Sequence, residues 1–132
     1  MPNHILIIDD EELVIKSLKK LLEDRHFSVA MAMNGQEALA VAEKDKFDLI
    51  IADIRMPGMS GVEIIQAIYE NLKKRNLSKI PVIFITGYAD EEIKQQAETL
   101  NPVAYIYKPF DNTELFSKIN LVLKNKNLSK IS

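Results

Sequence analysis

The chain has 132 residues, enough for one domain but not for two. Its composition, 47% hydrophobic and 27% charged, is that of an ordinary globular protein, and a net charge of -2 gives no electrostatic case for binding nucleic acid or an anionic membrane. The absence of cysteine excludes disulfides, thiol catalysis and thiolate metal sites.

The amino terminus predicts neither a signal peptide nor a membrane span. It carries no basic leader, and its apolar run, Ile5 to Ile8, is far too short for either. A cytoplasmic location is therefore the default expectation.

Short apolar runs typical of strands alternate with segments whose apolar residues recur at helical spacing. Strands are predicted at 5–8, 27–31, 49–52, 82–85 and 105–107. Helices are predicted at about 11–24, from the N-cap Asn34, at about 62–75, at about 90–101 and from about Asp111. This alternation indicates an α/β fold, a doubly wound parallel sheet with helices on both faces. The domain is expected to span 1–124, with 125–132 as a polar tail or the start of a linker.

Polar side chains follow four of the five predicted strands. Asp9 and Asp10 follow the first strand, Asp53 the third, Thr86 the fourth and Lys108 the fifth. In open α/β sheets, ligands bind in the crevice outside the carboxyl ends of the strands. These five side chains are therefore the candidate functional residues.

The order and spacing of these motifs resemble the receiver domain of two-component response regulators. The likeness rests on DD after the first strand, D-x-x-M-P-x-M-x-G after the third, T-G after the fourth and K-P-F after the fifth, and it covers about residues 5–123. It implies a flavodoxin-like fold with five strands in the order 2-1-3-4-5 and five helices. It also implies a phosphoryl-accepting signalling switch, phosphorylated at Asp53 from the phosphohistidine of a histidine kinase or phosphotransfer protein.

The acidic residues predict a magnesium site. In the family's fold the first and third strands are neighbours, so Asp9, Asp10 and Asp53 would converge. Crowded carboxylates repel each other unless a cation compensates, and Mg²⁺ suits a site of few carboxylates and several waters. The resemblance implies that Asp10 and Asp53 bind the metal directly, that Asp9 acts mainly through water, and that the backbone carbonyl of Arg55 completes the protein ligands.

Phosphoryl transfer to a carboxylate needs positioning and charge neutralisation rather than a base. Asp53 is the expected nucleophile and phosphoacceptor, with the ammonium of Lys108 and the hydroxyl of Thr86 each contacting a phosphoryl oxygen. The resemblance also implies a cis peptide bond between Lys108 and Pro109.

The resemblance implies a conformational switch. The charge of the phosphoryl group would draw Thr86 toward Asp53, and Tyr105 would turn inward to fill the space that Thr86 vacates. Tyr107 projects to the same side of its strand, which leaves the choice of switch aromatic open. The fourth helix, fifth strand and fifth helix would form the output face, which acts on a downstream protein or on an output domain outside this sequence. Homodimerisation through that face also stays open.

Two bulky residues lie where the family admits the attacking water. Arg55 and Tyr88 each stand two residues after Asp53 and Thr86 respectively. We hypothesise that their side chains slow hydrolysis of the phosphoryl group.

Three other classes of function compete with this interpretation. An aspartate-nucleophile phosphatase needs an acid-base Asp two residues after the nucleophile, where this chain has Arg55. A receiver is expected instead to promote only its own phosphorylation and dephosphorylation, with no separate substrate. A flavin or nucleotide binder needs a phosphate loop after the first strand, but the acidic residues at 9–12 would repel phosphate. A receiver-like binding module that is never phosphorylated is the remaining alternative.

Overall fold

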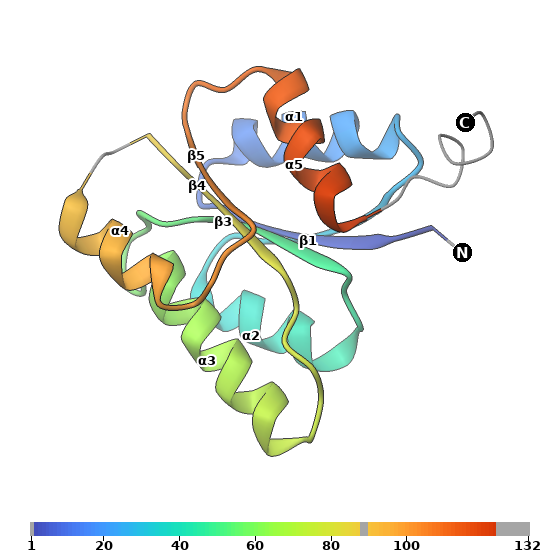
Figure 1. Cartoon of the computed structure of the whole chain (residues 1–132). Coiled ribbons are helices and arrows are strands. Elements are labelled where there is room, and N and C mark those ends of the chain that lie inside the picture. The colour runs from blue at the N-terminus through green and yellow to red at the C-terminus, as the bar shows by residue number, and fades with distance from the viewer. Residues whose placement is uncertain (1, 88–89, 124–132) are drawn as a thin grey trace.

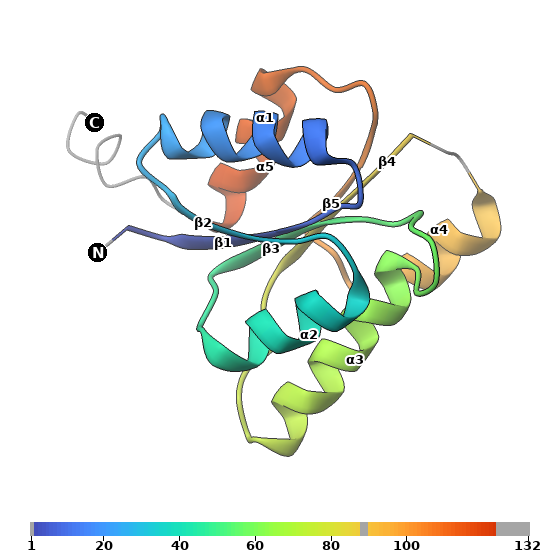
Figure 2. The same cartoon turned by 180° about the vertical axis from the view of Figure 1, so that it is seen from behind.

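The structure is a computed structural model, and it describes residues 2–87 and 90–123. The predicted tail at 125–132 and the candidate residue Tyr88 lie outside the described residues. Figures 1 and 2, which view the molecule from opposite sides, show one central sheet with helices packed on both of its faces.

The sheet is parallel, with five strands in the order β2-β1-β3-β4-β5. Its strands are β1 (His4–Ile8), β2 (Ser28–Ala32), β3 (Leu49–Asp53), β4 (Val82–Thr86) and β5 (Ala104–Tyr107). The predicted α/β fold and strand order are thus confirmed, and strand boundaries shift by at most one residue. The register pairs Ile8 with Ala52, Asp53 with Ile85 and Thr86 with Tyr107, which brings the carboxyl ends of these strands to one edge of the sheet.

Five helices connect and follow the strands. They are α1 (Glu12–Glu23), α2 (Gly35–Lys44), α3 (Gly61–Lys74), α4 (Glu91–Glu98) and α5 (Asn112–Val122). Helices α1 and α5 lie together on one face of the sheet, and α2, α3 and α4 cover the other (Figure 1). The prediction for α3 placed its start one residue too late because it missed the N-cap Ser60, which forms a capping box with Glu63. Asn34 and Asp111 cap α2 and α5 as expected, whereas Asp90, predicted in the first turn of the fourth helix, is the N-cap of α4.

Alternate residues of the strands supply two separate cores, because successive side chains of a strand point to opposite faces. In β1, Ile5 and Ile7 belong to the core beneath α1 and α5, whereas Leu6 and Ile8 belong to the core beneath α2, α3 and α4. All four are fully buried. Burial on both faces explains why the central strands are continuous apolar runs rather than alternating ones.

The hydroxyl of Tyr69 fastens α3 to the segment that enters β4. It donates a 2.6 Å hydrogen bond to the carbonyl of Ile80, and the Tyr69 side chain is buried. We expect Tyr69→Phe to lower the free energy of unfolding by about 1 to 2 kcal/mol, because a buried carbonyl loses its donor. Urea unfolding measures this loss. The matched control is Tyr107→Phe at an exposed position, and equal effects of the two substitutions would contradict the prediction.

Candidate functional site

The predicted functional side chains meet at the carboxyl-terminal edge of the sheet. Asp9 follows β1 directly, Asp53 is the last residue of β3, and Thr86 is the last residue of β4. They are the three buried polar or charged side chains recorded for the described residues, with Asp9 and Thr86 fully buried and Asp53 3% exposed. Because the core rarely accepts unpaired carboxylates, their burial here indicates a function rather than a solvated turn.

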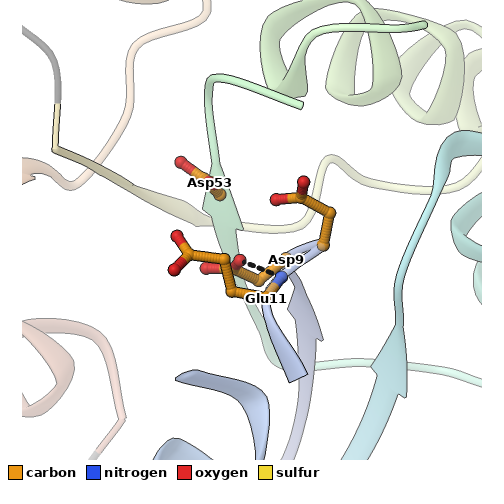
Figure 3. A group of neighbouring side chains, drawn as sticks. Asp9, Glu11 and Asp53 are labelled. Carbon is orange, nitrogen blue, oxygen red and sulfur yellow. Dashed lines mark hydrogen bonds between the residues drawn. The ribbon is translucent and has the colours of Figure 1, made fainter. Parts of the chain in front are cut away.

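Four acidic side chains form one cluster at this edge. Ligand oxygens of Asp9, Asp10, Glu11 and Asp53 all lie within 4.8 Å of one another. Figure 3 shows the carboxylates of Asp9 and Glu11, from the loop after β1, gathered beside Asp53 at the end of β3. The backbone N–H of Glu11 donates a 2.9 Å hydrogen bond to Oδ1 of Asp9, which fixes the course of this loop.

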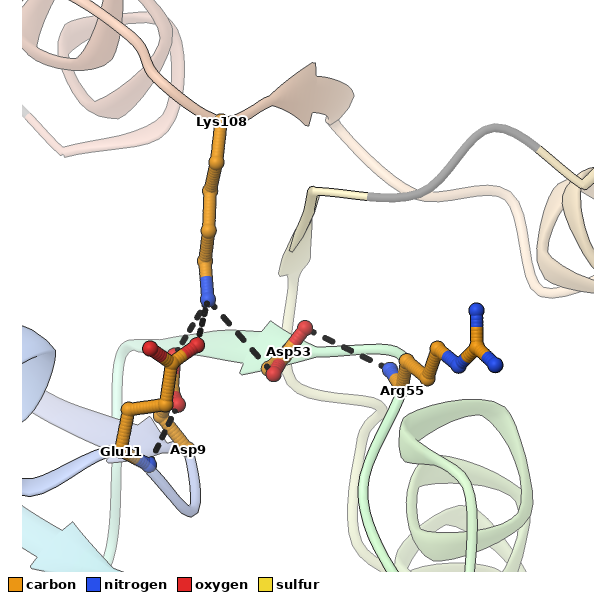
Figure 4. A network of polar contacts seen from close by, with 5 residues as sticks. All are labelled: Asp9, Glu11, Asp53, Arg55 and Lys108. Carbon is orange, nitrogen blue, oxygen red and sulfur yellow. Dashed lines mark hydrogen bonds and ion pairs between the residues drawn. The ribbon is translucent and has the colours of Figure 1, made fainter.

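The ammonium of Lys108 reaches into this cluster from the loop after β5. Its Nζ lies 3.0 Å from Oδ2 of Asp9, 3.3 Å from Oε1 of Glu11 and 3.6 Å from Oδ2 of Asp53 (Figure 4). The peptide bond between Lys108 and Pro109 is cis, the geometry that the resemblance implied. The structure therefore brings a cation and the expected nucleophile together, although they lie 55 residues apart in the sequence.

Burial perturbs the ionisation of the cluster. Burial, followed by the negative charge of Asp9, raises the pKa of Asp53 to about 6, although Lys108 acts in the opposite direction. Burial also raises the pKa of Asp9. For Lys108, burial alone lowers the pKa, but the hydrogen bond to Asp9 and the charges of Asp53 and Asp9 outweigh it, so the net shift is upward. The protein alone thus leaves the negative charge of Asp53 incompletely compensated.

The donor set fits a hard divalent cation. The clustered ligands are carboxylate oxygens from two neighbouring strand ends, and the burial of Asp53 destabilises its charge in the absence of a further cation. Mg²⁺ prefers oxygen ligands, and it is usually bound by few protein carboxylates while it keeps several waters. Asp10 is accessible to solvent, as a ligand to a metal that keeps several waters needs to be.

This ionisation predicts how Asp53→Asn changes stability with pH. A carboxyl group whose folded pKa is about 6, against an ordinary 3.8, binds more protons folded than unfolded between these values. Its contribution to stability is therefore lost as the pH rises through that window. Without added metal, Asp53→Asn should match wild type near pH 4 and be more stable by about 1 to 3 kcal/mol near pH 7. Urea unfolding across this range is the measurement, and a pH-independent difference would contradict the prediction.

The candidate switch residues lie next to this cluster. Thr86 is fully buried at the end of β4, and Tyr105 on the neighbouring strand is half-buried against the core beneath α3 and α4. Tyr107 is 43% exposed and contacts Tyr105 edge to face, with ring centroids 5.3 Å apart. Both aromatic side chains therefore share one side of β5, as the sequence indicated, and Tyr105 is the one that already packs on the core.

The two residues expected to affect hydrolysis are only partly described. The backbone N–H of Arg55 donates a 3.4 Å hydrogen bond to Oδ1 of Asp53. Figure 4 shows the Arg55 side chain extending away from the carboxylates, and this side chain is exposed. Tyr88 lies outside the described residues.

Sequence reasoning missed one member of the site, Glu11. The sequence placed this residue at the start of the first helix and in an acidic stretch that repels phosphate, whereas its carboxylate contacts Lys108. The sequence feature that could have identified Glu11 is its position directly after Asp9 and Asp10. The strand ends there, and the chain then turns beside the site.

The part of the chain that the structure describes contains no helix long and apolar enough to cross a membrane.

Comparison with known proteins identifies relatives along nearly the whole chain. The family model of the response regulator receiver domain matches residues 5–120. A probable transcriptional regulator, ycf29, from Porphyra purpurea is 38% identical over 136 residues, a match that covers 98% of this chain but 63% of that protein. The chain therefore spans less than two thirds of this relative's length.

Solved structures agree with the sequence relatives. A CheY-like response regulator receiver domain protein from Methanospirillum hungatei has a TM-score of 0.83 and 30% identity, and the match covers 100% of both chains. A response regulator protein from Burkholderia pseudomallei, solved with a phosphorylated aspartic acid, a calcium ion and citrate, has a TM-score of 0.76 and 26% identity, covering 98% of this chain and 71% of that one.

Proposed function

The chain belongs to the response regulator receiver family, and on this premise we propose that it is a signalling switch that accepts a phosphoryl group on Asp53. One observation carries the proposal: a buried carboxylate at the end of β3 lies 3.6 Å from the ammonium of Lys108, within an acidic cluster suited to a divalent cation. The Burkholderia relative, which contains a phosphorylated aspartic acid and a calcium ion, supports the same chemistry.

The proposed reaction moves a phosphoryl group from a histidine to Asp53. A carboxylate oxygen of Asp53 forms a bond to phosphorus while the bond from phosphorus to the donor's imidazole nitrogen breaks, and the nitrogen keeps the electron pair. Lys108 stays within reach to balance the charge on the transferred oxygens, and the Thr86 hydroxyl donates to one of them. Catalysis here is positioning and charge neutralisation, so no general base is needed.

Mg²⁺ is the proposed cofactor. Asp10, Asp53 and the backbone carbonyl of Arg55 would hold it directly, with Asp9 acting mainly through water. When bound, it would neutralise the crowded carboxylates and the negative charge of the transferred group.

The proposed partners are those of a two-component system. The phosphoryl donor is a histidine kinase or phosphotransfer protein. The response is relayed through Thr86 and Tyr105 to the face formed by α4, β5 and α5, which acts on a downstream protein or an output domain. The relatives named as transcriptional regulators are longer than this chain, which supports the second possibility. Three further points stay predictions. They are a cytoplasmic location, the absence of direct binding to nucleic acid or membrane, and the division into a domain at 1–124 and a polar tail or linker at 125–132.

Uptake of one phosphoryl group from a small donor tests this function. The purified chain is incubated with acetyl phosphate with and without Mg²⁺, and its intact mass is measured. We expect one added phosphoryl group only when Mg²⁺ is present. No adduct from a folded protein that binds Mg²⁺ and also receives nothing from histidine phosphodonors would favour the alternative, a binding module that is not phosphorylated.

Arg55 and Tyr88 are proposed to slow the loss of the phosphoryl group. Replacing both with alanine should shorten the half-life of the phosphorylated protein about five- to tenfold, because water reaches phosphorus more easily. The decay of the adduct is followed by intact mass after the donor is removed. Arg25→Ala, at an exposed residue that contacts Phe116, is the control for loss of a surface arginine. An unchanged half-life of the double variant would rule the idea out.

A further inference from the structure

Three carboxylates compete for the ammonium of Lys108. The two from the β1 side are the nearer ones, with Asp9 at 3.0 Å and Glu11 at 3.3 Å, while Asp53 lies at 3.6 Å. Hydrogen bonds are recorded from Nζ to Asp9 and Glu11, whereas the contact with Asp53 is an ion pair alone. Lys108 thus binds the loop after β1 more closely than it binds the phosphoacceptor.

Glu11 is held where it can make this contact. Its backbone N–H donates to Asp9, and its carbonyl accepts the 3.1 Å hydrogen bond from the N–H of Ile15 that starts α1. Its side chain crosses the mouth of the site to Lys108, 97 residues away (Figure 4). The next residue, Glu12, turns to Lys16 within the helix instead, at 2.9 Å. Of the two neighbouring glutamates, Glu11 therefore contacts Lys108 and Glu12 pairs within its own helix.

We propose that Glu11 is a positioning residue that retains the ammonium of Lys108 on the β1 side of the site and so weakens the binding of a phosphoryl group at Asp53. The proposal rests on the proposed function, because it concerns the same acceptor. A phosphoryl group on Asp53 brings new negative oxygens that need Lys108. Glu11 opposes a shift of Lys108 toward those oxygens, because the shift breaks the ion pair between Glu11 and Lys108.

Asp9 also holds Lys108, but it is a poor residue on which to test this role. It contacts Lys108 more closely, but it is fully buried and belongs to the expected metal site, so replacing it changes several interactions at once. Glu11 has a side chain that is 62% exposed, which allows its charge to be removed with little effect on packing. An exposed ion pair contributes only a modest free energy. We therefore expect a change of a few fold in phosphoryl binding and not its complete gain or loss.

The test compares Glu11→Gln with the matched control Glu12→Gln, which removes the same charge one residue away. Two quantities are measured with Mg²⁺ present: the acetyl phosphate concentration that gives half the maximal phosphorylation rate, and the dissociation constant of beryllium fluoride, a phosphoryl analogue, by calorimetry. The beryllium fluoride measurement reports binding at equilibrium and does not depend on phosphoryl transfer. We expect Glu11→Gln to lower both about two- to fivefold, and Glu12→Gln to leave both unchanged.

A third variant separates the contact from the charge. Glu11→Asp keeps the charge but withdraws the carboxylate by about 1.5 Å, one carbon–carbon bond, beyond ion-pair distance of Lys108. It should therefore resemble Glu11→Gln. Wild-type behaviour of Glu11→Asp would overturn the proposal, as would equal values for Glu11→Gln and Glu12→Gln, or weaker binding in Glu11→Gln. If wild type neither takes up the phosphoryl group nor binds beryllium fluoride, the proposed function itself fails and the role of Glu11 fails with it.

Discussion

Asp53→Asn is expected to abolish phosphoryl uptake completely while leaving a protein at least as stable as wild type. The amide replaces the charged carboxylate with a neutral group whose oxygen is too weak a nucleophile to attack phosphorus, and it keeps the size and shape of the side chain. Since burial and Asp9 raise the pKa of Asp53, its charge opposes folding near neutral pH, and the neutral amide removes that penalty. Intact mass after incubation with Mg²⁺ and acetyl phosphate measures the loss.

The stability of the variant makes the result interpretable. Inactive protein that also unfolds easily proves little, whereas an inactive protein of equal or greater stability has lost the acceptor itself. Asp45→Asn is the control, because Asp45 is an exposed residue at the end of α2, remote from the carboxylate cluster. It should take up the phosphoryl group as wild type does. Wild-type uptake by Asp53→Asn would show that another group is the acceptor.

Gly61→Ala is expected to be the most destabilising of the substitutions considered. A Cβ on Gly61 would overlap the carbonyl oxygen of Asp53, and it would lie 2.9 Å from the carbonyl carbon of Asp53 and 3.0 Å from Cα of Ile54. These are backbone atoms, which cannot turn aside as a side chain does. The N–H of Gly61 also donates a 2.8 Å hydrogen bond to the carbonyl of Ile54, which locks the first residue of α3 against the end of β3.

The clash should lower the free energy of unfolding by about 3 kcal/mol or more, because either β3 or α3 must shift. The shift also displaces Asp53, so the fraction that stays folded should accept the phosphoryl group more slowly. Gly87→Ala is the matched control, since among the described residues its Cβ would meet only Cβ of Lys108, at an ordinary 3.8 Å. Urea unfolding of the two variants side by side measures the difference. Equal stability of Gly61→Ala and Gly87→Ala would contradict the close approach of α3 to β3.

The positions of the strands and their order in the sheet were predicted on different grounds. The apolar run at 49–52 ends at Asp53 because the strand is buried on both faces and the chain must then turn, so local pattern was sufficient. The order of the strands came only from the resemblance to receiver domains, because alternation of strands and helices does not decide which strands are neighbours. Lys108 shows the consequence: the sequence alone places it after a strand, but only the fold places it beside Asp53.

What the sequence did not reveal depends on contacts between segments remote in the chain. The capping box of Ser60 was overlooked because the Pro and Gly of the preceding turn dominate the local pattern. Glu11 was overlooked because an acidic residue before a helix is usually a solvated one, and its contact with Lys108 appears only once β1 and β5 are placed. The resemblance already named Tyr105 as the switch aromatic, but that the core partly covers its ring and leaves the ring of Tyr107 exposed is a property of the packed sheet and not of either residue.

The identity of the phosphorylated residue tests the central claim most directly. The chain is incubated with Mg²⁺ and acetyl phosphate and treated with borohydride, which reduces an acyl phosphate to the alcohol, and its peptides are then sequenced by tandem mass spectrometry. The structure predicts that Asp53 alone is converted to homoserine, and only when Mg²⁺ was present. Conversion of another carboxylate, such as Asp9 or Asp10, with Asp53 intact would contradict the assignment of Asp53 as the phosphoacceptor.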